Sequence, residues 1–195
     1  MNIVNKLDIS EKYIVFIEAN LNHKEEVAIR GRLSDEITNN HYKTMNEHLK
    51  YLSKIFEKEV VVCIHPKYDL KSIQSRFQDF KVIKHRTREF IYKSFLVVFL
   101  DSSSIIDAFF LKKNIIQIKP SFDWSAGLDL VSKFGIINLD IQKHEERYIE
   151  KNKLKKMLEN SKTGYDNFIS SYIKHENDDE PGIDRVIKVL KEKFF

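Results

Sequence analysis

The stretch FLVVFLDSSS, at residues 95–104, decides the fold that the sequence predicts. Its first six residues are apolar without interruption, which is typical of a β-strand buried on both faces of a parallel sheet. The serines are followed by IIDAFFL at residues 105–111, which we expect to form a buried helix. The sequence therefore predicts a strand, a turn and a helix here, and residues 95–100 are the best candidate for the central strand.

Short apolar runs and longer helical stretches alternate on both sides of this segment. The run VVVCI at residues 60–64 has the same character and stops at His65-Pro66. Further strands are expected at residues 13–17, 80–84, 114–118 and 135–139, and further helices at residues 34–58, 70–77, 125–134 and from Thr87 onward. This alternation predicts an α/β protein with a Rossmann-like, doubly wound parallel sheet.

The longest expected helix covers residues 34–58. Ser34 precedes two acidic residues, a pattern typical of a helix start. Apolar side chains then recur at helical spacing and would form one buried face: Tyr42, Met45, Leu49, Leu52, Ile55 and Phe56. Beyond Asp140 the composition shifts towards Lys and Glu with helical spacing, so we expect a C-terminal helical segment that ends in a helix opened by Pro181.

The composition of the 195-residue chain is that of a globular protein, with 42% hydrophobic and 32% charged residues. These values exclude a disordered, collagenous or coiled-coil chain. The net charge of +4 is spread along the sequence, so we expect no nucleic-acid partner, whereas a phosphate-bearing ligand is compatible with it. The single cysteine, Cys63, excludes an intrachain disulfide, the N-terminus lacks a signal-peptide pattern, and no apolar run is long enough for a transmembrane segment. We therefore expect a cytoplasmic protein, with peripheral contact as the one form of membrane association open to it.

In a doubly wound sheet, ligands bind beyond the carboxyl ends of the strands. The candidate segments are therefore those directly after each apolar run: residues 18–26, 65–67, 85–87, 101–104 and 119–124. Among them, Ser102, Ser103 and Ser104 precede a helix, where unpaired amides, hydroxyls and the helix dipole favour a phosphate. The alternative is that one serine caps the helix and the others have no role. The sequence contains neither a glycine-rich dinucleotide motif nor a P-loop.

His65 is expected at the same edge, because it directly follows the strand at residues 60–64. Pro66 stiffens the turn, and the imidazole can donate a hydrogen bond to a phosphate or a base. The alternative is a surface histidine in a strand-ending turn. Residues 85–89, with Thr87 as an expected helix N-cap among basic residues, are more typical of a solvated basic turn than of a nucleotide site.

Two acidic positions are also candidates. Asp107 lies one helical turn after Ser103, from where a carboxylate can reach ribose hydroxyls or, alternatively, point to solvent. Glu18, followed by histidine and acidic side chains at residues 23–26, can supply an acid or a base to a second ligand, but the spacing matches no zinc or EF-hand pattern. Cys63 lies within an apolar run, so we expect no nucleophilic role for it.

Three motifs resemble a known family in their order and spacing. They are VVVCIHP at residues 60–66, IKHRTREFIYKS at residues 83–94 and VVFLDSSS at residues 97–104. Together they resemble the C-terminal half of GT-B-type glycosyltransferases of bacterial surface polysaccharide synthesis, above all the capsule-type enzymes. A more distant similarity is to bacterial sialyltransferases and polysialyltransferases with an HP motif and a serine motif. The similarity covers residues 13–139.

This resemblance implies a donor site made of His65, Thr87, Ser102, Ser103, Ser104 and Asp107. His65 would be the catalytic residue that, with the serines, stabilises the departing nucleotide phosphate. Thr87 would lie nearby, and Asp107 would hold the ribose. The donor would be a nucleotide-sugar substrate, with a CMP-linked sugar as one candidate, and neither a cofactor nor a metal is expected.

A complete GT-B enzyme has two Rossmann-like domains, whereas residues 1–140 are expected to form one, with residues 141–195 as a helical segment packed on it. The acceptor-binding half would be a separate polypeptide, another part of a longer chain, or lost, and a homo-oligomer is a further expectation. The predicted function is the nucleotide-sugar-binding domain of a metal-independent glycosyltransferase in capsular or lipopolysaccharide synthesis. The alternatives are a non-catalytic interaction module and another enzyme on the same half-fold, such as a sugar-nucleotide epimerase or a phosphate-binding hydrolase.

Overall fold

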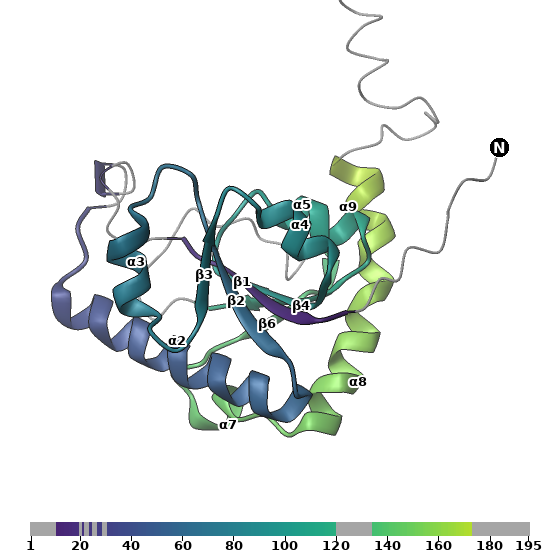
Figure 1. Cartoon of the computed structure of the whole chain (residues 1–195). Helices are drawn as coiled ribbons and strands as arrows, with labels where there is room; N and C mark the ends of the chain where they lie inside the picture. Colours follow the sequence, from purple (N-terminus) through teal and green to yellow (C-terminus); the bar gives the residue numbers. More distant parts are fainter. Residues whose placement is uncertain are drawn as a thin grey trace, which may run out of the picture.

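The computed structural model describes residues 11–19, 21, 24, 27, 28, 31–119 and 134–172. Within these residues the chain forms a six-stranded sheet with helices on both faces (Figure 1). The strands are β1 (Tyr13–Ile17), β2 (Glu59–Ile64), β3 (Lys81–Lys84), β4 (Ser94–Phe99), β5 (Asn114–Ile118) and β6 (Ile137–Leu139). Neighbouring strands are parallel throughout, in the order β3-β2-β1-β4-β5-β6. This is the order of a Rossmann-like sheet, so the predicted fold class is confirmed.

The apolar runs predict the strands well because the central strands are buried on both faces. Val97 and Val98 of β4 have no exposed surface, and β4 lies beside β1 in the middle of the sheet, as expected for the most apolar run. Ile17 of β1 is the register partner of both Cys63 in β2 and Phe99 in β4. The carboxyl ends of these three strands therefore reach the same level at one edge of the sheet.

Helices cover the sheet from both sides. They are α2 (Asp35–Phe56), α3 (Leu70–Arg76), α4 (Thr87–Tyr92), α5 (Ile105–Phe110), α7 (His144–Arg147), α8 (Lys151–Ser161), the 3-10 helix η1 (Lys162–Gly164) and α9 (Tyr165–Tyr172). Side chains of α2, α3 and α8 join Ile14 and Phe16 of β1 in one core cluster. Those of α4, α5 and α9 join Val15 and Ile17 in the other. Alternate residues of β1 thus serve opposite cores.

Helix α2 begins and packs as the sequence predicts. Ser34 is the N-cap, and its hydroxyl accepts a hydrogen bond from the N–H of Ile37 at 3.2 Å. The predicted apolar face is buried, apart from the half-buried Ile55. His41 and His48 are also buried on this helix, a feature that apolar spacing does not predict.

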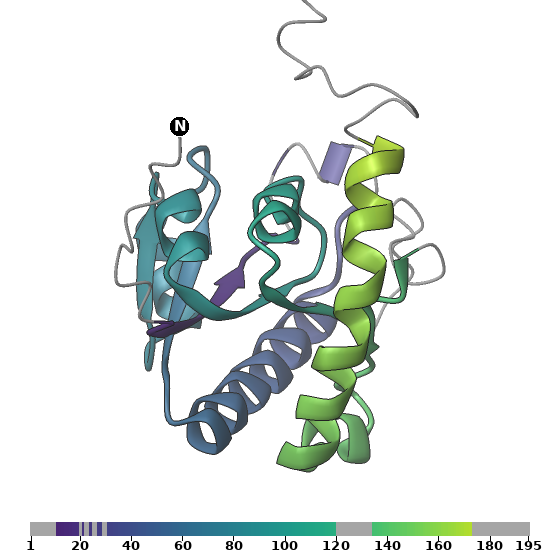
Figure 2. The same cartoon turned by 90° about the vertical axis from the view of Figure 1, so that its right-hand side faces the viewer.

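The helices after β6 pass from one face of the sheet to the other (Figure 2). Leu154 of α8 belongs to the core that contains α2, whereas Tyr165 and Phe168 of α9 belong to the core that contains α5. Gly164 ends η1 between them, and a Cβ at this position would collide with the main-chain carbonyl of Phe134. The crossing therefore depends on a residue without a side chain.

Two expected helices lie outside the described residues: the one at residues 125–134, apart from its last residue, and the one opened by Pro181. Among the helices that the structure does describe, none combines the length and the apolar character that a membrane span requires.

Candidate functional site

The strand order reverses between β1 and β4, since the chain runs outward from β1 to β3 and then returns to the other side of β1. A ligand crevice is expected at such a point, beyond the carboxyl ends of the strands. Because the strands are parallel, the structure brings four predicted segments to this edge: residues 18–19, 65–67, 85–87 and 101–104. The other candidates, His23, Glu25, Glu26 and residues 120–124, lie outside the described residues.

The serine triplet connects β4 to α5. Ser103 is exposed, whereas Ser102 and Ser104 are half-buried. The hydroxyl of Ser102 accepts a hydrogen bond from the N–H of Ser104 at 3.3 Å. Ser104 occupies the N-cap position of α5 without a side-chain cap. Ser102 therefore supports the turn, but no serine side chain caps α5, so the alternative that one serine caps the helix is wrong.

The expectation that the first amides of α5 are unpaired is wrong. The N–H groups of Ile105, Ile106 and Asp107 donate to the carbonyls of the residues three positions earlier, each at 3.2 Å. This tight turn satisfies the amides locally. An anion bound here would therefore be held by serine hydroxyls rather than by helix amides.

His65 is exposed in a tight turn that ends β2. The N–H of Tyr68 donates to the carbonyl of His65 at 3.0 Å, and the N–H of Lys67 donates to the ring Nδ1 of His65 at 3.2 Å. Since Nδ1 accepts, a neutral ring carries its proton on Nε2, from where it can donate to a ligand.

Strand β1 separates His65 from the serines, because β2 and β4 pair with opposite sides of β1. Neighbouring strands are about 4.8 Å apart, so the ends of β2 and β4 lie about 10 Å apart. This spacing fits a ligand with several phosphate or sugar groups better than a single phosphate that both sides bind.

Thr87 is the first residue of α4 rather than its N-cap, which corrects the sequence-based expectation. Arg86 occupies the N-cap position and provides no side-chain hydrogen bond. The hydroxyl of Thr87 instead lies near the Cys63 thiol in β2. The pKa of Cys63 is raised to about 12, because burial raises it by more than the neighbouring Thr87 hydroxyl lowers it. The thiol is therefore protonated at neutral pH, in line with the expectation that it is not a nucleophile.

Asp107 forms an ion pair between α4 and α5. Its Oδ2 lies 3.0 Å from Nε of Arg88, and the two side chains are 25% and 84% exposed. A second ion pair lies within α4 and its N-cap: both carboxylate oxygens of Glu89 accept hydrogen bonds from the Arg86 guanidinium, at 2.7 and 2.8 Å. Residues 85–89 thus have the contacts of a solvated basic turn, and a ribose would have to compete with Arg88 for Asp107.

A buried polar chain beside the carboxyl edge of the sheet joins the predicted candidate Glu18 to Tyr42 and Arg76, for which the sequence predicted no role in the site. Glu18, only 5% exposed at the end of β1, accepts a 2.6 Å hydrogen bond from the hydroxyl of Tyr42. The same hydroxyl accepts from Arg76 at 2.8 Å, and the guanidinium stacks 4.5 Å from the Tyr42 ring. Burial, followed by the nearby Glu18 carboxylate, raises the pKa of Tyr42. The alternation Ile14, Phe16, Glu18 is the signal that places this acid on the α2 face.

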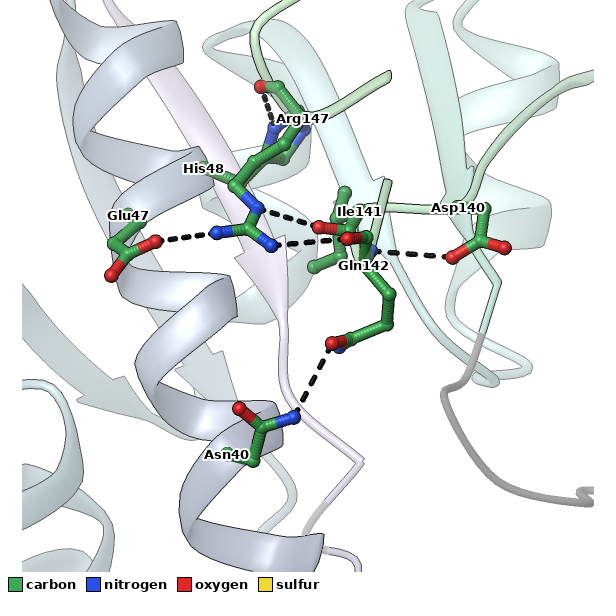
Figure 3. A network of polar contacts seen from close by, with 7 residues as sticks. All are labelled: Asn40, Glu47, His48, Asp140, Ile141, Gln142 and Arg147. Atoms are coloured by element: carbon green, nitrogen blue, oxygen red, sulfur yellow. Dashed lines mark hydrogen bonds and ion pairs between the residues drawn. The ribbon is translucent and has the colours of Figure 1, made fainter. Parts of the chain in front are cut away.

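A second polar network joins α2 to the segment after β6 (Figure 3). The Arg147 guanidinium contacts Glu47 at 2.7 Å and donates to the carbonyls of Ile141 and Gln142 at 2.6 and 3.3 Å. Nδ1 of His48 lies 2.8 Å from the carbonyl of Arg147. These contacts are directed at main-chain groups, so we interpret the network as a structural anchor for the C-terminal helices.

The two buried histidines of α2 remain uncharged at neutral pH. Burial lowers the pKa of His41 to about 4, and burial with the nearby Arg147 charge does the same for His48. Within the described part of the chain, no three His, Cys, Asp or Glu side chains gather in a group that could hold a metal ion.

The fold of this chain is similar to solved structures of known proteins, although its sequence matches no known family. No protein-family model matches the chain, and no curated protein sequence matches it. Among solved structures, spinosyn rhamnosyltransferase SpnG complexed with spinosyn aglycone matches with a TM-score of 0.57 and 11% identity, over 93% of this chain and 46% of that one. SpnG without a stated ligand gives a TM-score of 0.54 at 12% identity, and SpnG complexed with thymidine diphosphate gives 0.53 at 13%; both cover 93% of this chain and 45% of theirs.

The chain therefore shares its Rossmann-like fold with part of the spinosyn rhamnosyltransferase structures. The chain spans about half the length of the solved structures that it matches.

Proposed function

We propose that this chain is the nucleotide-sugar-binding domain of a glycosyltransferase. The observation that carries the proposal is the strand order, because it sets His65 and the serine turn on opposite sides of β1 at the crevice edge. A solved protein of similar fold is complexed with thymidine diphosphate, which supports a nucleoside phosphate as the ligand.

The proposed chemistry is stabilisation of the leaving group. When the bond between the sugar and the phosphate breaks, negative charge develops on the phosphate oxygens. Hydrogen-bond donors fixed around those oxygens favour the transition state over the bound substrate. Because β1 separates the two sides, we propose the Nε2–H of His65 as the donor to one phosphate group of the ligand and the hydroxyls of Ser103 and Ser104 as donors to another phosphate or sugar group. The proposed transfer does not depend on a metal ion.

The finer parts of the proposal rest on the motif resemblance. They are a role in capsular or lipopolysaccharide synthesis, a CMP-linked sugar as a candidate donor, and a second half that supplies the acceptor site and the base. The likeness of this chain to about half of a larger enzyme agrees with the last part.

Calorimetric titration with CMP, UDP, GDP and TDP tests the proposal. We expect at least one of them to bind, and we expect His65→Ala and Ser103→Ala each to weaken that binding about tenfold, as loss of a hydrogen bond to a charged group does. His144→Ala and Thr163→Ala remove an exposed imidazole and an exposed hydroxyl far along the chain and serve as matched controls. Folded protein that binds none of the four nucleotides would rule the proposal out.

Asp107 has its own test within this proposal, because its carboxylate is shared with Arg88. We expect Asp107→Asn to weaken nucleotide binding several-fold if the carboxylate holds the ribose. Arg88→Ala removes the exposed partner of the ion pair, so the ribose no longer competes for the carboxylate and binding should be equal to or tighter than that of the wild type. Equal affinities in Asp107→Asn and the wild type would remove Asp107 from the site.

An interaction module is the second candidate, and exposed apolar side chains favour it. Ile37, Leu70 and Ile106 are 41%, 42% and 37% exposed. They lie in the first turns of α2, α3 and α5, which face the crevice edge because each helix follows a parallel strand. A domain closing over this edge would cover them. Sedimentation of the wild type and an Ile37→Ser/Leu70→Ser/Ile106→Ser variant tests self-association through this edge: the wild type should associate with rising concentration, and the variant should not.

A further inference from the structure

We propose that Tyr68 is a positioning residue that holds the imidazole of His65 with its Nε2–H directed outward as a hydrogen-bond donor. The proposal rests on the proposed function, in which His65 contacts the nucleotide phosphate. It concerns a residue outside the motifs and is carried by three contacts: Tyr68 to the end of β1, Tyr68 to the His65 ring, and the main chain to the other side of that ring.

The first contact ties the turn to the centre of the sheet. Tyr68 is 9% exposed, and its hydroxyl donates to the carbonyl of Ala19 at 3.0 Å. Ala19 follows Glu18, whose N–H donates to the carbonyl of Cys63 at 3.0 Å and so extends the pairing of β1 with β2. The acceptor of the Tyr68 hydroxyl therefore belongs to a fixed main chain. A buried tyrosine hydroxyl needs such a partner, because a buried unpaired one is costly.

The second contact passes this anchorage to His65. The rings of His65 and Tyr68 lie 5.4 Å apart at an interplanar angle of 49°, within the range of a favourable tilted aromatic pair. The Tyr68 ring thus supports one side of an imidazole that is otherwise exposed.

The main chain fixes the other side of the ring. The N–H of Lys67 donates to Nδ1 of His65, and the N–H of Tyr68 closes the turn on the carbonyl of His65. Pro66 restricts the backbone between them. Loss of the Tyr68 hydroxyl would free the turn from β1, and the ring would then move and exchange its proton between Nδ1 and Nε2. A preorganised donor would become a mobile one, with lower affinity for phosphate oxygens.

The test uses Tyr68→Phe, which keeps the ring and removes the hydroxyl. Its matched control is Tyr51→Phe, because the Tyr51 hydroxyl also donates to a main-chain carbonyl, that of Ile149 at 2.7 Å, in another part of the fold. Long-range ¹H–¹⁵N correlation spectra of the unliganded proteins report which His65 nitrogen carries the proton. We expect His65 to be the Nε2–H tautomer in the wild type and in Tyr51→Phe, and a mixture of tautomers in Tyr68→Phe.

Binding gives the second readout, with whichever of CMP, UDP, GDP and TDP binds the wild type most tightly. We expect Tyr68→Phe to weaken it three- to tenfold, Tyr51→Phe to leave it unchanged, and Tyr68→Phe to have no further effect in the His65→Ala background, since it acts through that ring. Unchanged affinity in Tyr68→Phe, or additive losses in the double variant, would overturn the proposal.

The two readouts separate this proposal from the proposed function. If the wild type binds none of the nucleotides, the proposed function fails, and the spectra still decide whether Tyr68 fixes the ring. A wild-type His65 with its proton on Nδ1 would overturn the positioning role without any variant, including the case in which Tyr68→Phe does not fold.

Discussion

Acidification from pH 7 to pH 5 should destabilise this protein, because two histidines of α2 are buried in the neutral form. The pKa of both His41 and His48 is lowered from the ordinary value of 6.5 to about 4. Between these two values the unfolded chain binds protons that the folded chain does not, so stability falls as the pH falls from 6.5 towards 4. The stability that the neutral histidines contribute is fully retained above pH 6.5, the pKa of histidine in the unfolded chain.

The magnitude follows from the two pKa values. One pKa unit corresponds to about 1.4 kcal/mol, and pH 5 lies about 1.5 units below the unfolded value, so each histidine costs about 2 kcal/mol at that pH. Both together cost about 4 kcal/mol, a large share of the stability of an ordinary domain. Carboxylates contribute little in this window, since they titrate mainly below it.

The assay is urea unfolding followed by circular dichroism at pH 7 and pH 5. His48→Asn keeps a side-chain donor for the carbonyl of Arg147 and cannot titrate. It should cost stability at pH 7 and then lose only about 2 kcal/mol on acidification, whereas the wild type loses about 4. His144→Asn changes an exposed histidine and should behave as the wild type. An equal loss in His48→Asn and the wild type would refute the reasoning for His48.

Three further predictions concern stability at neutral pH. Gly164→Ala should lower the free energy of unfolding by about 1–3 kcal/mol in thermal denaturation, because its Cβ meets the carbonyl of Phe134; an unchanged melting temperature would contradict the crossing described. Ser34→Ala should lower the free energy of unfolding in urea by about 1 kcal/mol, whereas Ser34→Asp should keep the N-cap of α2 and the stability. Equal stabilities of the two variants would show that the cap does not contribute. Tyr42→Phe should lower the free energy of unfolding by about 1–3 kcal/mol, because it removes a hydrogen-bond donor from the buried Glu18 carboxylate. Tyr51→Phe, which removes a less buried hydroxyl, is the control. A smaller loss of stability in Tyr42→Phe than in Tyr51→Phe would contradict the presence of a buried carboxylate.

The sequence predicts most of the fold because the deciding signals are local. Burial on both faces leaves an uninterrupted apolar run, as at β4, and a serine before two acids marks the start of α2. The strand order is harder to predict, because an apolar run does not indicate which other strands pair with it in the sheet. The βαβ alternation restricts these neighbours to a few arrangements, and a doubly wound sheet is among them.

The site is predicted less well because its contacts join distant residues. Arg88 and Asp107 are 19 positions apart, Glu18 and Tyr42 are 24 apart, and Glu47 and Arg147 are 100 apart. The spacing of residues within a single helix or strand does not predict contacts between residues so far apart in the sequence. The amides of α5 illustrate the local limit: whether they are unpaired depends on the turn geometry, which three serines in a row do not specify.

Three acidic side chains among the described residues of the carboxyl edge already have hydrogen-bond or ion-pair partners. Asp107 pairs with Arg88, Glu18 accepts from Tyr42, and Asp69 accepts from the N–H of Ser72 at 2.7 Å as the N-cap of α3. A carboxylate held by a donor repels a phosphate less than a free one does, because the donor offsets its field. The groups left facing the crevice edge then include the donors of His65 and the serine turn. The pairing of these three carboxylates, together with the donors of His65 and the serine turn, would favour the nucleoside phosphate that the proposed function requires.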